Sequence, residues 1–144
     1  MKVSGSYQFD APPQKVWDTL MEPETLSGCI PGCDGFNSTG PDQYQAVVNV
    51  GVGPVRGRYN AKIALLDQHP PTSYRLSMEG SGPAGFVNGT ASVTLTEAGD
   101  KTSVQVDGDA QVGGTVARVG QRLIGSVAKT LMDRFFGCLN EAVR

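Results

Sequence analysis

Cys29 and Cys33, four positions apart, are the residues whose type and spacing most suggest chemistry. They flank a turn-forming Ile-Pro-Gly segment and could bind a metal, form a disulfide or perform thiol redox reactions. A structural zinc site takes four Cys or His ligands, and the only further ones here, His69 and Cys138, lie far away in the sequence. A redox CxxC pair has one intervening residue fewer than this pair. We therefore expect a tight turn with reduced, metal-free Cys29 and Cys33, and a disulfide across the turn is the alternative.

Three other patterns resemble functional motifs but lack residues that the chemistry requires. Gly51–Gly57 is rich in glycine like a phosphate-binding loop, yet no Lys-Ser/Thr pair follows it and a strand pattern comes next. Asp107 and Asp109 alternate with apolar residues, which places both on the wet face of a strand. His69 has no nucleophile pattern near it. The sequence therefore predicts a protein that is not an enzyme and holds no metal or covalent cofactor.

Length and composition favour one ligand-binding domain over residues 1–144. The net charge is −2, with 39% hydrophobic and 18% charged residues, so the broad basic surface of a nucleic-acid-binding protein is not expected. No segment approaches the ~20 apolar residues of a membrane span, and the N-terminus lacks the apolar run of a signal peptide. We expect a cytoplasmic protein, and a peripheral contact with the inner face of the membrane stays open.

Segments that alternate apolar and polar residues with a period of two are typical of half-buried strands. Turn signals such as Gly40-Pro41-Asp42 and Ala98-Gly99-Asp100 separate them. Short connections and one apolar face predict a curved, seven-stranded antiparallel sheet with a wet and a dry face. Six strong segments begin near Lys2, Tyr44, Val55, Tyr74, Val87 and Val104, and a weaker one covers 35–39.

Helical patterns follow the first strand and the last strand. Two short helices are expected, one opened by Asp10–Pro13 and one running from Pro23 to Gly28. Apolar residues then recur every three or four positions over Val116–Val143, with Thr115 as the expected N-cap. The dry face of the sheet is the only apolar surface against which this long helix can pack. The sequence therefore predicts an α+β fold in which the sheet wraps around the C-terminal helix.

Glycines on the dry face predict empty space between the sheet and the long helix. A glycine inside a strand packs no side chain, so either the sheet bends sharply around a filled core or an apolar cavity remains. We expect the cavity, with its mouth near the loops Gly51–Pro54 and Ser81–Gly85. The inward glycines are Gly5, Gly57, Gly80, Gly89 and Gly108.

The expected cavity favours a hydrophobic ligand because the side chains around it are almost all apolar. Two helix glycines, Gly120 and Gly125, widen the same space. The expected lining residues are Tyr7, Val50, Tyr59, Met78, Phe86 and Val106 from the strands, and Val119, Leu123, Ile124, Val127 and Leu131 from the long helix.

A set of short motifs along the chain is specific only in combination. They are Gly5-Ser6-Tyr7, Phe9-Asp10-Ala11-Pro12, Val16-Trp17, Cys29-Ile30-Pro31-Gly32-Cys33, Val50–Gly57, Gly85–Gly89, Val112-Gly113-Gly114 and Val119–Ile124. With them the chain resembles the carbon monoxide dehydrogenase CoxG family, in the START/Bet v 1-like (SRPBCC) superfamily, over essentially its whole length. The resemblance implies a helix-grip fold and a non-catalytic accessory to a molybdenum-containing CO dehydrogenase or related hydroxylase. Some members carry a C-terminal tail thought to reach the membrane, whereas the helical pattern here runs to Arg144.

The implied role and the expected cavity lead to one functional hypothesis and two alternatives. An enzyme that oxidises CO must pass electrons to an acceptor, and respiratory quinones such as menaquinone are lipids. We expect a lipid carrier that moves a quinone between membrane and enzyme. The first alternative is an assembly or membrane-recruitment factor that binds the dehydrogenase through its surface. The second is a START-like cyclase or lyase, which the nearly apolar lining disfavours.

Overall fold

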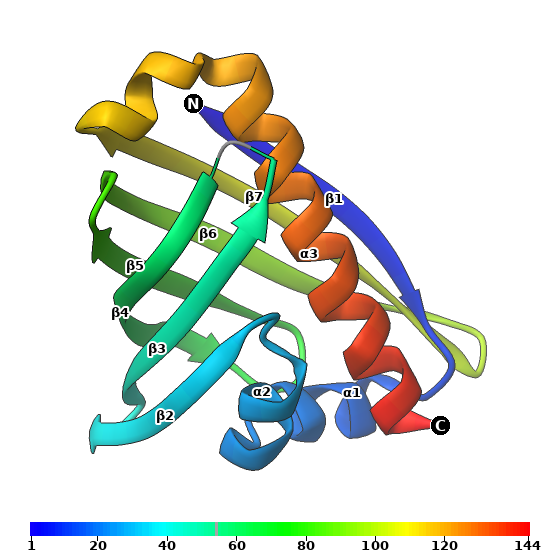
Figure 1. Ribbon diagram of the computed structural model, residues 1–144. Helices are drawn as coiled ribbons and strands as arrows, with labels where there is room; N and C mark the ends of the chain where they lie inside the picture. The colour runs from blue at the N-terminus through cyan, green and yellow to red at the C-terminus, as the bar shows by residue number, and fades with distance from the viewer. Residues whose placement is uncertain (54) are drawn as a thin grey trace.

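Within the described residues, seven strands form one antiparallel sheet with the order β1-β7-β6-β5-β4-β3-β2 (Figure 1). The computed structural model describes residues 1–53 and 55–144, so Pro54, part of the expected cavity mouth, lies outside the described residues. The antiparallel meander and the weak strand near 35–39 are both confirmed. The strands are β1 (Lys2–Phe9), β2 (Cys33–Gly40), β3 (Gln43–Val52), β4 (Val55–His69), β5 (Ser73–Gly82), β6 (Gly85–Ala98) and β7 (Lys101–Gly113).

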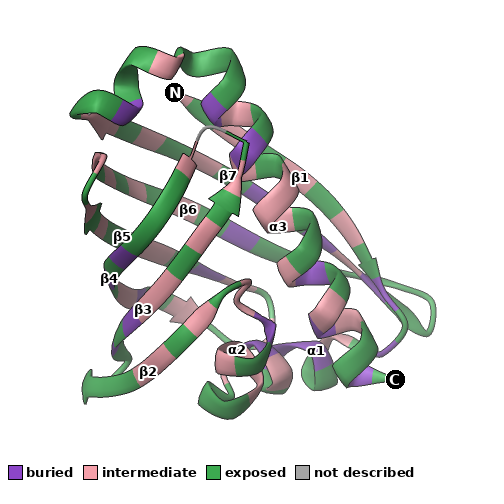
Figure 2. Ribbon diagram, viewed as in Figure 1, coloured by how far each residue is buried: buried purple, intermediate pink, exposed green. Residues whose placement is uncertain are grey.

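The two faces of the sheet differ because side chains alternate along each strand. On β4, Tyr59 and Ala61 are buried, whereas Asn60 and Lys62 are exposed. Figure 2 shows the same alternation of buried and exposed positions on other strands. We call the face that carries Tyr59 and Ala61 the inner face, and the opposite one the outer face.

Helices cover the inner face unevenly. Helix α1 (Pro13–Leu20) and helix α2 (Pro23–Cys29) close one end of the sheet, and α3 (Gln121–Val143) runs along the inner side (Figure 1). Both short helices begin with proline, whose missing N–H is no loss in a first turn. Helix α3 packs mainly against β1, α1 and α2 rather than against the middle strands.

The long C-terminal helix predicted over Val116–Val143 is interrupted at Gly120. Residues Thr115–Val119 form a 3₁₀ helix, η1, and α3 begins only at Gln121. Gly120 has a φ of 96°, a left-handed conformation that side chains disfavour and that ends the helical run. Thr115, the expected N-cap, does not cap a helix with its side chain. Its Oγ1 donates to the carbonyl oxygen of Ala84 at 2.9 Å, which ties η1 to the turn between β5 and β6.

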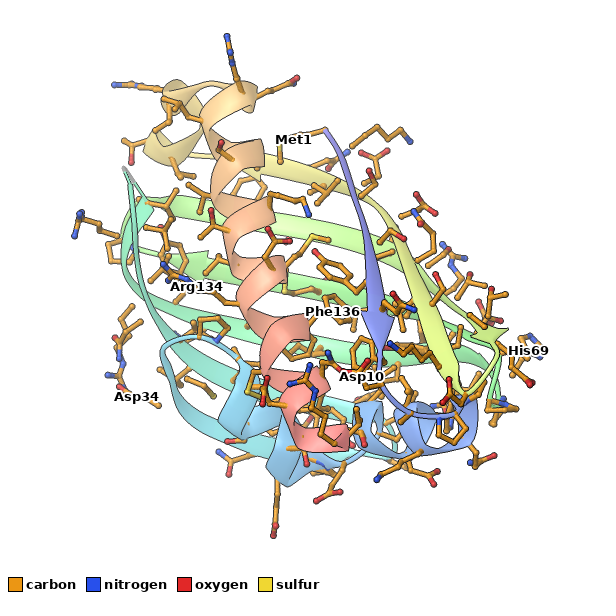
Figure 3. All side chains as sticks on the ribbon, turned by 90° about the vertical axis from the view of Figure 1, so that its right-hand side faces the viewer. Met1, Asp10, Asp34, His69, Arg134 and Phe136 are labelled. Carbon is orange, nitrogen blue, oxygen red and sulfur yellow. A yellow bond between two sulfur atoms is a disulfide. The ribbon has the colours of Figure 1, made fainter. Side chains whose placement is uncertain are left out.

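The main cluster of buried side chains, which we call the contiguous core, lies at the end closed by α1 and α2. Phe9 and Leu139 are both 0% exposed there. Trp17 of α1 packs edge-on against Tyr74 of β5, with ring centroids 5.5 Å apart. Phe136, labelled in Figure 3, fixes α3 against β1 through an edge contact with Phe9. Burying such side chains stabilises a fold by about 1.5–3 kcal/mol each, so this end anchors the molecule.

Candidate ligand-binding face

The end of the inner face opposite the contiguous core is bounded by η1, the β3–β4 hairpin, the β5–β6 hairpin and the first half of α3, and we call it the η1 end (Figure 1). The backbone N–H of Val116 in η1 donates to the carbonyl oxygen of Ala84 at 2.7 Å. At Gly53, in the β3–β4 hairpin, a Cβ would lie 3.9 Å from Val127 of α3. These contacts join segments far apart in the sequence around one end of the sheet.

Apolar side chains at the η1 end are not sealed from solvent. Met78 lies on the inner face between its cross-strand neighbours Ile63 and Gly89. The Met78 residue keeps 39% of its surface exposed. Leu123, in the first turns of α3, keeps 51%. Of the other expected lining residues, Tyr59, Val106, Ile124 and Val127 are buried, and Tyr7, Val50, Val119 and Leu131 are half-buried.

Phe86 does not belong to this set. It directly precedes Val87, which pairs with Gly80 and lies on the inner face. Because side chains alternate along a strand, Phe86 lies on the outer face. There its ring covers Gly113 of β7 and borders a shallow hollow with Asn60 and other outer-face residues. The expectation that Phe86 lines the interior is therefore wrong.

The space above the inward glycines differs from one to the next. Around Gly80, a Cβ would meet only backbone oxygens, at 3.7 and 3.9 Å, and no side chain. At Gly89 and Gly108 the nearest atoms are backbone oxygens of neighbouring strands, at 3.1 and 3.2 Å. Gly57 has a φ of 126°, so its backbone conformation explains the glycine. At Gly5 the ring of Tyr7 occupies the position. Gly80 is thus the clearest unfilled position.

Several buried apolar residues stand apart from the contiguous core. They are Ala46, Tyr59, Ala61, Val116, Ile124 and Val127, all buried but outside the packed cluster. All of them lie on the middle strands, on η1 or in the first half of α3. A domain usually has one contiguous core with smaller satellite clusters beside it. The buried residues of the η1 end therefore pack apart from the core that α1 and α2 close.

Tyr59 is the polar exception at the η1 end. Its hydroxyl is buried and has no hydrogen-bond partner, the one such side-chain atom in the described part of the chain. Its ring lies over Gly82 of β5, where a Cβ would come within 2.7 Å of the ring. Gly82 lies beyond the strand that the sequence predicts to end at Gly80, although the same period of two would have indicated it.

Tyr7 closes the seam between β1 and α3 instead of presenting its hydroxyl to the interior. The hydroxyl donates to Asp133 of α3 at 2.8 Å, and Lys129 also donates to Asp133, at 2.7 Å. The Lys129 ammonium lies 5.2 Å from the centre of the Tyr7 ring. Burial, followed by the hydrogen bond to Asp133, raises the pKa of Tyr7, and the hydrogen bond from Lys129 lowers the pKa of Asp133.

The cysteines pair in a way that the sequence does not predict. Cys29, at the end of α2, forms a disulfide with Cys138 of α3, with Cα atoms 5.4 Å apart. The expectation of a reduced Cys29 is therefore wrong, and so is the alternative of a bond across the turn. Cys33 is a free thiol at the start of β2. Among the described residues, no three His, Cys, Asp or Glu side chains gather as a metal site would require.

Two hollows in the described surface, of about 390 and 240 Å³, both lie on the outer face. Charged side chains border both: Lys2, Arg75 and Asp107 the larger, and Lys62 and Glu79 the smaller. Neither corresponds to the apolar cavity expected beneath α3, and that cavity stays a prediction.

The segments that bound the η1 end carry more basic than acidic residues, although Arg58 is paired with Asp34 and Lys129 with Asp133. No acidic residue occurs between Asp109 and Asp133, a stretch with Arg118, Arg122 and Lys129. Residues 43–66, which include the β3–β4 hairpin, also hold three basic residues and no acidic one, and residues 80–96 hold no charge. Arg118 in η1 and Arg122 in the first turn of α3 are exposed and have no acidic partner among the described residues.

No helix in the described residues is long and apolar enough to cross a membrane.

Comparison with solved structures identifies the fold. A conserved protein from Geobacillus kaustophilus is 37% identical over 99% of this chain and 95% of its own, with a TM-score of 0.96. A START superfamily protein from Mycobacterium smegmatis is 15% identical, with 99% and 96% coverage and a TM-score of 0.77. Ara h 8.0201 is 14% identical, with 99% and 97% coverage and a TM-score of 0.70. The fold is therefore START/Bet v 1-like, as the sequence predicts.

Comparison at the sequence level identifies the family. No curated protein matches the chain closely enough to count as a relative. The family model for CoxG, described as a subunit of carbon monoxide dehydrogenase, matches residues 5–144, nearly the whole chain. The chain therefore belongs to the carbon monoxide dehydrogenase CoxG family.

Proposed function

We propose that the protein binds a long-chain respiratory quinone at the η1 end of its inner face and carries it between the membrane and a molybdenum-containing CO dehydrogenase. The observation that carries this proposal is the unsealed apolar surface around Met78 and Gly80. An inner-face methionine that is 39% exposed, beside a glycine with no side chain above it, leaves apolar surface without a protein partner. A hydrophobic ligand would gain about 25 cal/mol for each Å² of such surface that it covers.

Family membership supports the choice of ligand. A protein associated with an enzyme that oxidises CO serves a reaction that releases electrons, and a quinone accepts electrons while its isoprenoid chain stays apolar. The START/Bet v 1-like fold favours ligand binding over catalysis here, because the inner face at the η1 end offers mostly apolar side chains and a single buried hydroxyl, that of Tyr59.

The basic η1 end suits the membrane contact that a carrier needs. Arg118 of η1, and Arg122 and the exposed Leu123 in the first turn of α3, belong to the same end as the unsealed apolar surface. Anionic headgroups attract juxtamembrane Lys and Arg by about 1 kcal/mol each. We therefore infer that this end faces the membrane when the ligand enters or leaves.

Mass spectrometry of the purified full chain tests the proposal. Native spectra should show a second species, heavier by the mass of one quinone, and solvent extraction should release that quinone. The bare protein should also take up a prenylated naphthoquinone from vesicles. A protein that carries no extractable lipid and takes up no quinone would contradict the proposal, and a role as an assembly or membrane-recruitment factor would replace it.

A further inference from the structure

Tyr59 combines deep burial with an unpaired hydroxyl. The residue is 8% exposed, and its Oη has no hydrogen-bond partner. A buried hydroxyl without a partner has lost its hydrogen bonds to water and gained none in return. Native structures pair most buried polar groups, so this exception needs an explanation. By contrast, the buried hydroxyl of Thr102 donates to the carbonyl oxygen of Ala11 at 2.7 Å, and the hydroxyl of half-buried Tyr7 donates to Asp133.

Two glycines leave room for the Tyr59 ring. At Gly82 a Cβ would come within 2.7 Å of the ring, and at Gly57 a Cβ would lie 4.0 Å from it. The ring therefore lies across positions that carry no side chain. Its strand position places it on the inner face, two residues from Ala61 and four from Ile63, the direct neighbour of Met78. The ring thus lies at the η1 end, on the same inner face as Met78 and Gly80.

We propose that the Tyr59 hydroxyl is the polar anchor of the ligand site, where it hydrogen-bonds an oxygen on the ring of an otherwise apolar molecule. This inference rests on the proposed function and specifies which chemical group of the ligand is recognised. A tyrosine hydroxyl both donates and accepts. It donates to the carbonyl of an oxidised quinone and accepts from the hydroxyl of the reduced form, so one residue serves both states of the ligand.

The variant Tyr59→Phe tests the anchor because it removes only the hydroxyl. The probes are a 1,4-naphthoquinone with an isoprenoid chain and a naphthalene hydrocarbon with the same chain. We expect Tyr59→Phe to bind the naphthoquinone about tenfold more weakly, the effect of one hydrogen bond of about 1.4 kcal/mol, and to bind the hydrocarbon as the parent does. The Tm of the ligand-free variant should equal or exceed that of the parent, since no hydrogen bond is lost.

Tyr44→Phe is the matched control. Tyr44 is also a buried inner-face tyrosine, but it belongs to the contiguous core, where its ring stacks on Phe36. The affinity of this variant for both probes should match that of the parent.

The outcomes separate the two proposals. If the parent binds neither probe, the proposed function fails and the anchor fails with it. If the parent binds the naphthoquinone and Tyr59→Phe binds it equally well, the anchor alone is overturned. A lower Tm for ligand-free Tyr59→Phe, or equal losses of affinity for both probes, would assign the hydroxyl a structural role and would also overturn the anchor.

Discussion

Cys29 at the end of α2 is covalently joined to Cys138 in α3, 109 residues further along the chain. The bond fastens the short helices that close one end of the sheet to the C-terminal half of α3. The contiguous core lies at this same end. This end is thus fixed both by packing and by a cross-link, whereas the described residues of the η1 end carry no such cross-link.

We predict that the disulfide stabilises the fold because it closes a long loop. Cross-linking such a loop reduces the entropy of the unfolded chain, and disulfides typically stabilise a protein by about 2–4 kcal/mol. Cys138→Ser should lower the free energy of unfolding by this amount, whereas Cys33→Ser should leave it nearly unchanged. Urea denaturation measures both. Thiol titration of the unfolded parent should detect one thiol per chain. Three thiols would show that the bond does not form, and equal stability with and without reductant would show that it does not stabilise the fold.

The seam between β1 and α3 should weaken in acid. The hydrogen bond from Lys129, and then that from Tyr7, lowers the pKa of Asp133 from its usual 3.8. A carboxyl with a lowered pKa in the folded state stabilises it fully above the usual value, and the contribution fades as the pH falls through the lowered value. The Tm of Asp133→Asn should therefore lie below that of the parent at pH 6.

As the pH falls below 3.8 and through the lowered pKa of Asp133, that difference should shrink, because the parent then loses the same charge. Asp100→Asn, in the turn between β6 and β7, is the control, since Asp100 has no ion-pair partner among the described residues. A Tm difference for Asp133→Asn that stays constant from pH 6 to pH 2 would contradict the assignment.

Charge reversal at the η1 end should weaken membrane contact. Arg118→Glu and Arg122→Glu should each reduce binding to vesicles that contain anionic lipid by at least about fivefold, since each basic side chain contributes about 1 kcal/mol. Lys15→Glu makes the same charge change on α1, at the other end of the molecule, and should have little effect. Co-sedimentation at low and high salt measures the difference. Equal losses in all three variants would mean that net charge, rather than the η1 end, governs binding.

The strands and the fold could be predicted because each strand keeps one dry face. Tyr59, Ala61 and Leu65 all fall on the same alternation, and that period of two determines both the strand and its inner face. The same rule exposes the error at Phe86: it stands one residue before inward Val87, so its apolar character did not place it inside. Hydrophobic side chains on an outer face are common, and composition alone does not exclude them.

Long-range pairing and local backbone conformation could not be predicted in the same way. Cys29 and Cys138 are adjacent only because α2 packs on α3, and connectivity among cysteines does not follow from their spacing. The break at Gly120 depends on a left-handed conformation, whereas the apolar period runs on through it from Val116 to Ile124. The unpaired hydroxyl of Tyr59 is likewise a property of the packed structure, and a tyrosine in an alternating pattern does not reveal it.

Gly80 is the position at which to block the proposed site. A Cβ there would meet backbone oxygens at 3.7 and 3.9 Å, which are ordinary contacts, whereas at Gly89 and Gly108 backbone oxygens at 3.1 and 3.2 Å would have to shift. Gly80→Leu should therefore fill space that a ligand would use, without the ~1–3 kcal/mol loss that overpacking a filled core brings. Ser81→Leu is the matched control, because Ser81 is the next residue and borders the outer-face hollow.

The most direct test of the carrier account is the affinity of these two variants for a naphthoquinone with an isoprenoid chain, measured alongside their Tm. The account predicts that Gly80→Leu keeps a Tm near that of the parent and loses quinone binding, and that Ser81→Leu keeps both. A folded Gly80→Leu that binds the quinone with unchanged Kd would contradict the account.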